Sequence, residues 1–185
     1  MKLDVVFVTG NADKAARFSK HMGMNIAHEP AELDEIQTLN PAELVSHKAR
    51  QAYEQIGKPV LVEDVTFTYE VLGELPGPFV KFFVDADDGA EKMCRILDGF
   101  NNRRAEGRCT FGYFDGHDLR LFSGVVRGKV AQHPRGTGGY GFDRIFEVDG
   151  SNGRTAAELT DAEYDDYYTT IKPFADVREF LRSIQ

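Results

Sequence analysis

The sequence predicts an α/β fold with a mixed sheet. Val5–Val8 is a four-residue apolar run that leads into a glycine turn and a helical pattern, as a buried strand does before a helix. Val60–Val62 is a second short apolar run, which is typical of a central parallel strand. Two long stretches of β-branched and aromatic residues, 108–114 and 119–130, flank Asp115–Asp118 and predict a hairpin. Long antiparallel strands in mid-chain imply a second lobe, formed by about residues 100–135.

Length and composition indicate one globular domain over residues 1–185, because 42% hydrophobic and 28% charged residues are ordinary for such a protein. No apolar run approaches the ~18 residues that cross a bilayer, and Asp4 interrupts any signal sequence, so we expect a cytoplasmic protein with no membrane partner. The net charge of −8 argues against a stable nucleic-acid partner. Cys94 and Cys109 match no zinc spacing and are predicted to be buried free thiols.

Capping residues and apolar periodicity predict the helices. The first is expected over 12–21. The second begins at Pro41, where Asn40 caps the first turn and Glu43 reaches back to close the cap, and it ends at 57–59. Further helices are expected over 79–84, after a rigid loop at 75–78, and over 89–97 and 174–184.

The segment Gly10–Lys14 indicates a phosphate site. Gly10 and Asn11 suit a tight turn, and Lys14 falls in the first turn of the following helix, where free backbone N–H groups and the helix dipole favour an anion. The segment is neither a Walker P-loop nor a GxGxxG fingerprint, so an ordinary strand-to-helix turn is the alternative.

Three carboxylates are candidates for a magnesium site. Glu63 and Asp64 follow the Val60–Val62 run, at the edge where open α/β sheets bind ligands. They point to opposite faces of an ideal strand, so both serve one site only if the strand has already turned. Glu35 lies between apolar residues in a loop or short strand. Such oxygen ligands suit a Mg²⁺ ion that also holds substrate phosphates, and a solvated surface carboxylate is the alternative for each.

A glycine-rich segment, 136–141, precedes Phe142 and Asp143. Glycine density favours close approach of the backbone to a ligand, and an exposed linker explains it equally well. The tyrosine-rich segment Tyr164–Tyr168 has two interpretations, a ligand-stacking patch or an exposed acidic helix edge with buried rings. The histidines show no metal-ligand spacing, and no serine or cysteine lies in a nucleophile motif.

Four landmarks in this order make the chain similar to a known family. They are Thr9-Gly10-Asn11 with Lys14, Glu63-Asp64, Leu75-Pro76-Gly77-Pro78-Phe79, and Gly141-Phe142-Asp143 with Ile145-Phe146. Over nearly the whole chain they resemble the inosine triphosphate pyrophosphatase family, also called the Ham1-like family. The resemblance implies an elongated two-lobed α/β fold with a central nucleotide cleft. It also implies a cytoplasmic homodimer that hydrolyses non-standard purine nucleoside triphosphates, such as ITP, dITP and XTP, to the monophosphate and pyrophosphate.

The resemblance assigns roles by position. It implies that the triphosphate is held by Thr9, Gly10, Asn11 and Lys14, with Lys81 as a further contact. Magnesium is assigned to Glu35, Glu63 and Asp64, and catalysis to Asp64, which activates water, together with Lys14. Around the base it places Tyr140, Gly141, Phe142 and Asp143.

The chain departs from the family where the base is read. The family usually has a Lys-Asn pair and then Ser-His-Arg, whereas this chain has Tyr164-Asp165 and then Tyr168-Thr169-Thr170; Lys172 is a candidate substitute. Arg144 also replaces a usual proline. We therefore expect intact hydrolysis with altered base recognition. The alternatives are the same hydrolysis on a different modified nucleotide, or a catalytically weak nucleotide-binding regulator.

Overall fold

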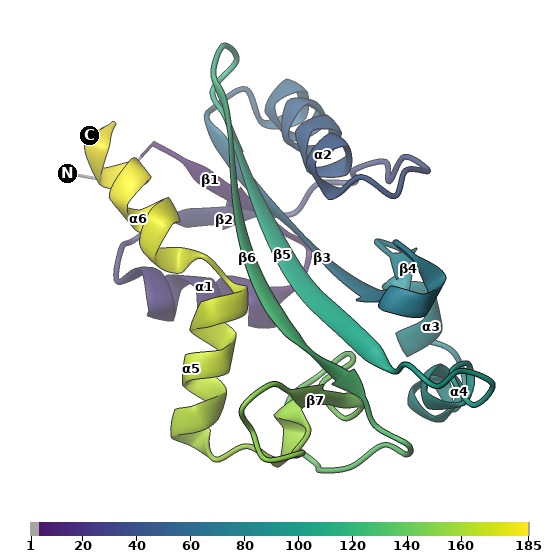
Figure 1. Ribbon diagram of the computed structural model, residues 1–185. Coiled ribbons are helices and arrows are strands. Elements are labelled where there is room, and N and C mark those ends of the chain that lie inside the picture. Colours follow the sequence, from purple (N-terminus) through teal and green to yellow (C-terminus); the bar gives the residue numbers. More distant parts are fainter. Residues whose placement is uncertain (1–3, 185) are drawn as a thin grey trace. The chain divides into compact units, whose positions relative to one another are not determined.

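The computed structural model describes residues 4–184 and confirms the α/β class with a mixed sheet. The described residues form a seven-stranded sheet in the order β2-β1-β3-β5-β6-β7, with β4 paired to β3 off this path (Figure 1). Its strands are β1 (Val6–Val8), β2 (Ala27–Glu29), β3 (Val60–Tyr69), β4 (Pro76–Gly77), β5 (Arg104–Phe114), β6 (Leu119–Val130) and β7 (Phe146–Val148). The helices are α1 (Ala12–Met22), α2 (Pro41–Ile56), α3 (Val80–Val84), α4 (Gly89–Arg95), α5 (Asp161–Ile171) and α6 (Phe174–Ser183), with 3₁₀ turns η1 (Glu70–Leu72) and η2 (Ala156–Glu158).

The chain divides into two compact units. The first unit contains the residues up to Asp64, Thr110–Ser123 and the residues from Pro173 onward, and so holds β1, β2, α1, α2, α6 and the start of β3. The second unit contains Val65–Cys109 and Gly124–Lys172, and so holds β4, α3, α4, β7 and α5. Residues 110–123 of the expected second lobe belong to the first unit.

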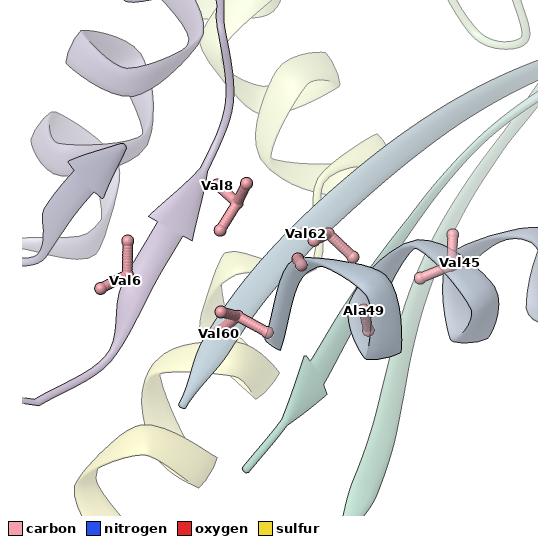
Figure 2. Close-up of a cluster of buried hydrophobic side chains, with 7 residues drawn as sticks. Val6, Val8, Val45, Ala49, Val60 and Val62 are labelled. Atoms are coloured by element: carbon pink, nitrogen blue, oxygen red, sulfur yellow. The ribbon is translucent and has the colours of Figure 1, made fainter. Parts of the chain in front are cut away.

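Parallel strands form the centre of the first unit. Val6 of β1 pairs with Ala27 of β2 on one side and with Val60 of β3 on the other. Since side chains alternate along a strand, one face of β1 and β3 presents valines to helix α2. The cluster drawn in Figure 2 contains Val6, Val8, Val60 and Val62 from the strands and Val45 and Ala49 from α2.

The opposite face of β1 packs against α1 and α6, which contact each other. Phe7 stacks on Phe18 of α1 with ring centroids 4.2 Å apart, and Phe174 of α6 lies 6.1 Å from Phe18. Phe111 of β5 completes the aromatic cluster, 6.3 Å from Phe7. Both faces of β1 are therefore buried, which explains why its sequence is continuously apolar instead of alternating.

Helix α2 begins as predicted, with one correction at its cap. Asn40 Oδ1 accepts hydrogen bonds from the backbone N–H groups of Ala42 and Glu43, at 3.0 and 3.4 Å, and Pro41 is the first helical residue. The Glu43 side chain does not close the cap, because its Oε2 accepts from the Thr38 hydroxyl at 2.7 Å. The Asn40 N–H group that it was expected to bind donates to Thr38 Oγ1 at 3.2 Å.

Strand β3 is longer than the predicted Val60–Val62. It continues to Tyr69, so Glu63 and Asp64 lie inside the strand and do not follow its end. The extension contains threonine, valine and aromatic residues, which favour a pleated strand, and β4 pairs with it at Phe67 and Thr68. The expectation of a strand end at Val62 was therefore wrong.

The mid-chain hairpin is confirmed. β5 begins at Arg104 instead of 108, while β6 has the expected limits. In the connecting turn, Asp115 Oδ1 accepts hydrogen bonds from the N–H groups of Asp118 and His117 at 2.8 and 2.9 Å. These two bonds favour the carboxylate and lower the pKa of Asp115.

Aromatic rings form the core of the second unit. Phe67 of β3 stacks on Phe142 with centroids 4.2 Å apart, and Phe146 of β7 meets Phe67 edge-on at 5.1 Å.

The two short helices expected near 79–84 and 89–97 are present as α3 and α4. Cys94 and Cys109 are buried and outside any disulfide, as predicted, and burial raises the pKa of Cys94 to about 11. None of the helices in residues 4–184 combines the length and apolar character that a membrane-spanning segment needs.

The start of α5 makes a testable contribution to acid stability. Glu163 accepts two hydrogen bonds from the Arg154 guanidinium, at 2.6 and 2.8 Å, and one from the Thr160 N–H group at 2.9 Å, which together lower its pKa from 4.5 to about 2. A depressed carboxyl pKa contributes stability above pH 4.5 that is lost as the pH falls toward 2. As the pH is lowered from 4.5 to about 2, we expect the thermal unfolding midpoint of Glu163→Gln to fall less than that of the wild type, as measured by circular dichroism. Parallel curves for the two proteins would contradict this.

Candidate active site

The two carboxylates of β3 lie just past the point where β1 stops pairing with it. β1 and β3 are in register at Val6–Val60 and Phe7–Leu61, and β1 ends at Val8. Glu63 and Asp64 therefore extend beyond the carboxyl end of β1, even though β3 itself continues. As consecutive strand residues they point to opposite faces, with Glu63 contacting α1 and Asp64 contacting α2.

The start of α1 carries a lysine that is held by Glu63. Lys14 Nζ lies 3.0 Å from Glu63 Oε1, and the Glu63 side chain is only 6% exposed while that of Lys14 is 33% exposed. Asn11 Oδ1 caps the helix by accepting from the Lys14 N–H group at 3.1 Å, and Thr9 Oγ1 accepts from the Asn11 N–H group at 3.1 Å. The side chains of Thr9 and Asn11 thus shape the turn that presents Lys14.

Gly10 leaves open space beside this helix start. Its φ is outside the left-handed region, and an added Cβ would meet no atom within 4 Å. Neither the backbone conformation nor packing within the described chain therefore requires glycine here. The absence of a side chain instead keeps the first turn of α1 accessible, as a phosphate-binding turn needs.

On the other face of β3, Lys48 of α2 lies between two carboxylates. Its Nζ is 3.2 Å from Asp64 Oδ1 and 3.2 Å from Glu35 Oε1. The Lys48 and Asp64 side chains are 11% and 12% exposed, whereas Glu35 is 52% exposed. Asp64 Oδ2 is buried and has no hydrogen-bond partner among the residues that the structure describes.

Burial and neighbouring charges set the protonation states of Asp64 and Lys48. Burial raises the pKa of Asp64, with a further increase from Glu35, and the ammonium groups of Lys48 and Lys14 oppose this rise without cancelling it. For Lys48, burial lowers the pKa, but the carboxylates of Asp64 and Glu35 outweigh burial and raise the pKa above its usual 10.5. Lys48 is therefore a fixed cation beside a carboxylate that takes up protons more readily than an ordinary aspartate.

The carboxylates do not converge into a closed metal cage. Across residues 4–184, no three His, Cys, Asp or Glu side chains are grouped closely enough to hold a metal ion. Of the residues predicted as ligands, Glu35 and Asp64 share Lys48, while Glu63 contacts Lys14. The structure thus alternates acids and lysines where the sequence suggested three acids together.

Lys48 is the site residue that the sequence reasoning missed. A signal for it exists in the helix pattern, because Lys48 lies four residues from both Leu44 and Ala52 on the buried face of α2. A lysine on the apolar face of an amphipathic helix is uncommon unless it is paired with a carboxylate.

In the second unit, the residues expected around the base have mixed surroundings. Tyr140 is 41% exposed, and Gly141 is exposed with φ +65° and no atom within 4 Å of an added Cβ. Phe142 is only 7% exposed and stacks on Phe67, so its ring belongs to the aromatic core of the second unit. Asp143 is 4% exposed and accepts hydrogen bonds from protein groups.

The two remaining lysines are in contrasting environments. Lys81 is exposed on α3. Lys172 is 3% exposed, with Nζ 5.7 Å from the centre of the Tyr168 ring. Tyr167 and Tyr168 are themselves buried on α5, so the tyrosine-rich segment is a helix edge with buried rings, one of the two interpretations of its sequence.

Comparison with known proteins agrees with this architecture. Residues 5–179 match the family model of the Ham1 family. The chain belongs to the Ham1 family. Inosine triphosphate pyrophosphatase 2 of Trypanosoma cruzi is 40% identical to this Ham1-family chain over 162 residues, which cover 86% of the chain and 82% of the relative. Inosine triphosphate pyrophosphatase of Schizosaccharomyces pombe is 36% identical over 183 residues, or 97% and 95% of the two chains.

Solved structures give the same result. A HAM1 protein from Coxiella burnetii superimposes with a TM-score of 0.81 and 27% identity, over 98% of each chain. The Staphylococcus aureus Ham1 protein superimposes with a TM-score of 0.83 over 98% of this Ham1-family chain, at 19% identity, which supports the fold alone. The resemblance drawn from the four sequence landmarks is confirmed.

Proposed function

We propose that this Ham1-family chain hydrolyses non-standard purine nucleoside triphosphates, such as ITP, dITP and XTP, to the monophosphate and pyrophosphate. The observation that carries the proposal is the state of Asp64, whose Oδ1 is fixed by Lys48 while its buried Oδ2 has no partner among the described residues. The names of the relatives support the substrate class, since both relatives described above are inosine triphosphate pyrophosphatases.

The lysines suit a polyphosphate substrate. A triphosphate near neutral pH carries about four negative charges, so the attack of water on it requires cations that offset this charge. Lys14 lies in the first turn of α1, whose free N–H groups and dipole also favour an anion. We infer that polyphosphate oxygens compete with Glu63 for the Lys14 ammonium.

Asp64 is the group that takes a proton from the attacking water. In the reaction, the water oxygen bonds to phosphorus, the anhydride bridge between the α- and β-phosphates breaks, and pyrophosphate leaves. One water proton passes to Asp64 Oδ2, the oxygen that Lys48 leaves available. The raised pKa of Asp64 improves it as a base, because general-base catalysis is most effective when the pKa approaches the working pH.

The donor set also fits a magnesium ion. Mg²⁺ is usually bound by one or two carboxylates together with substrate phosphates and water, so a closed cage of three acids is not needed. Glu63 of β3 and the half-exposed Glu35 are the carboxylates that would hold it, which leaves Asp64 Oδ2 to take the proton. When bound, the ion would neutralise charge on the phosphate oxygens. Homodimerisation and a cytoplasmic location remain predictions from the sequence.

The decisive experiment is a substrate panel with detection of pyrophosphate. We expect turnover of ITP and XTP to exceed that of ATP, to disappear with EDTA and to return with added Mg²⁺. Equal rates on ATP and ITP would overturn the base preference. No pyrophosphate from any triphosphate in the presence of Mg²⁺ would overturn hydrolysis.

The panel also includes dUTP and modified pyrimidine triphosphates. Thr169 and Thr170 are exposed on α5 where the family usually has histidine and arginine, and this favours hydrolysis of a different modified nucleotide as the second candidate. A site that hydrogen-bonds a substrate group rejects an analogue lacking it by roughly 10⁴-fold, whereas shape alone discriminates weakly. A pyrimidine that is turned over faster than ITP would establish this alternative.

A further inference from the structure

A buried carboxylate in the second unit is bonded to two tyrosines of helix α5. Asp143 Oδ2 accepts hydrogen bonds from the Tyr164 hydroxyl at 2.7 Å and from the Tyr140 N–H group at 3.0 Å. Its Oδ1 accepts from the Tyr167 hydroxyl at 3.0 Å. Asp143 is only 4% exposed, and these three donors help to stabilise its buried carboxylate.

The same carboxylate fixes the shape of the glycine-rich segment 136–141. Gly139 has φ +67°, and a Cβ added there would collide with Asp143 Oδ2. The Tyr140 N–H group next to it donates to that oxygen, so the turn is closed on the carboxylate. Only glycine combines this backbone conformation with so close an approach.

Polar bonds, and not burial, hold this segment in place. Residues 137–141 are all exposed, so apolar packing contributes little to their position. Gly138 donates its N–H group to the Ala157 carbonyl at 3.3 Å, and Arg144 Nε donates to the Gly136 carbonyl at 3.2 Å. The Asp143 carboxylate links the segment to α5, because two of its donors, Tyr164 and Tyr167, belong to that helix.

We infer that Tyr164 and Tyr167 are positioning residues for substrate binding, which act through the Asp143 carboxylate to hold segment 136–141 and its exposed Tyr140 ring in the binding conformation. This inference rests on the proposed function and on the expectation from the sequence resemblance that Tyr140 lies against the base. The hydroxyl groups themselves are directed at Asp143, so their removal alters the position of the segment and not the groups that act on phosphate.

Tyr164→Phe tests this with a single lost hydroxyl group. A hydrogen bond to a carboxylate is among the stronger ones, so its loss is expected to raise the KM for the preferred nucleoside triphosphate about 10-fold with little change in kcat. Inorganic tripolyphosphate, which has no base, should inhibit the variant and the wild type with the same Ki. Tyr113→Phe is the matched control, because the Tyr113 hydroxyl also donates to an aspartate, Asp115 at 3.4 Å, but in the turn of the β5–β6 hairpin.

A double-mutant cycle identifies the shared contact. Gly139→Ala should raise KM on its own by pushing the segment away from Asp143 Oδ2. Because both changes break the same link, Gly139→Ala combined with Tyr164→Phe should raise KM by clearly less than the product of the two single effects. If the double variant raises KM by the full product of the two single effects, the tyrosine acts elsewhere, and the inference is overturned.

Two further outcomes would also overturn it. One is an unchanged KM in a folded Tyr164→Phe protein, and the other is an equal rise in the KM for nucleotide and the Ki for tripolyphosphate, which indicates general damage. If the wild type releases no pyrophosphate, the proposed function fails, and the same variants are compared by calorimetric titration with ITP and tripolyphosphate. Weaker binding of ITP alone in Tyr164→Phe supports the inference, and unchanged or absent ITP binding rejects it.

Discussion

Asp64→Asn is expected to lower kcat for pyrophosphate release by about 10³-fold, because general-base catalysis typically contributes 10²–10⁴-fold and an amide cannot accept the proton. The substitution keeps the size of the side chain and an oxygen that can accept from Lys48, whose Nζ is 3.2 Å from Asp64 Oδ1. Nucleotide binding should therefore persist while chemistry is lost. The measurement is the rate of pyrophosphate release at saturating ITP and Mg²⁺, with binding followed separately by calorimetry.

The control for this variant is Asp149→Asn. Asp149 forms an ion pair with Arg104 at 2.7 Å in the second unit, so the same chemical change removes a charge at a position with no part in the proposed reaction. Its kcat should stay within about twofold of the wild type. Full magnesium-dependent turnover by Asp64→Asn would show that another group takes the proton, and the proposed mechanism would be wrong.

The pH dependence of kcat/KM in the wild type is expected to depend on the ionisation of Asp64. Asp64 must be ionised to act as a base, so kcat/KM should fall as the pH drops through its raised pKa, at a higher pH than for an ordinary aspartate. The effect on stability has the opposite sense. Since the folded state binds this proton more tightly than the unfolded state, the contribution of Asp64 to stability improves as the pH falls toward 3.8.

The sequence was sufficient to predict the elements that depend on local chemistry. Asn40 and Pro41 start α2 because capping involves neighbouring residues only, and Asp115 closes the hairpin turn for the same reason. The alternation of Glu63 and Asp64 across β3 was predictable as well, and their contacts with α1 and α2 agree with it. The family was identified because its landmarks occur in the same order along one chain.

The remaining features depend on contacts between distant parts of the chain. Lys48 and Asp64 are 16 residues apart, and only the packing of α2 on β3 brings the ammonium to the carboxylate. The Phe142 ring stacks on Phe67, which is 75 residues away in the sequence. Asp143 likewise receives its hydroxyl donors from α5. Periodicity indicates that such a side chain is buried but does not identify the partner.

Lys48→Met is expected to move the acid limb of the kcat/KM profile upward by about one to three pH units, and so to lower activity at any pH below the new limb. Lys48 opposes the effect of burial on Asp64, and an adjacent cation typically lowers a carboxyl pKa by that amount. Without it, Asp64 becomes protonated at a higher pH and is less available as a base. Activity should therefore recover in part as the pH rises, and Lys48→Arg, which keeps the charge, should retain a profile close to that of the wild type.

Lys58→Met separates this effect from the loss of any positive charge. Lys58 lies 3.9 Å from Asp4, and both side chains are largely exposed, at 54% and 82%. An exposed pair of this kind interacts weakly, so the pH profile should not move. If Lys48→Met lowers kcat equally at every pH, the lysine acts on the substrate itself and not through the ionisation of Asp64. A shift of the acid limb in Lys48→Met alone would assign Lys48 as the positioning residue that keeps the buried carboxylate ionised at neutral pH.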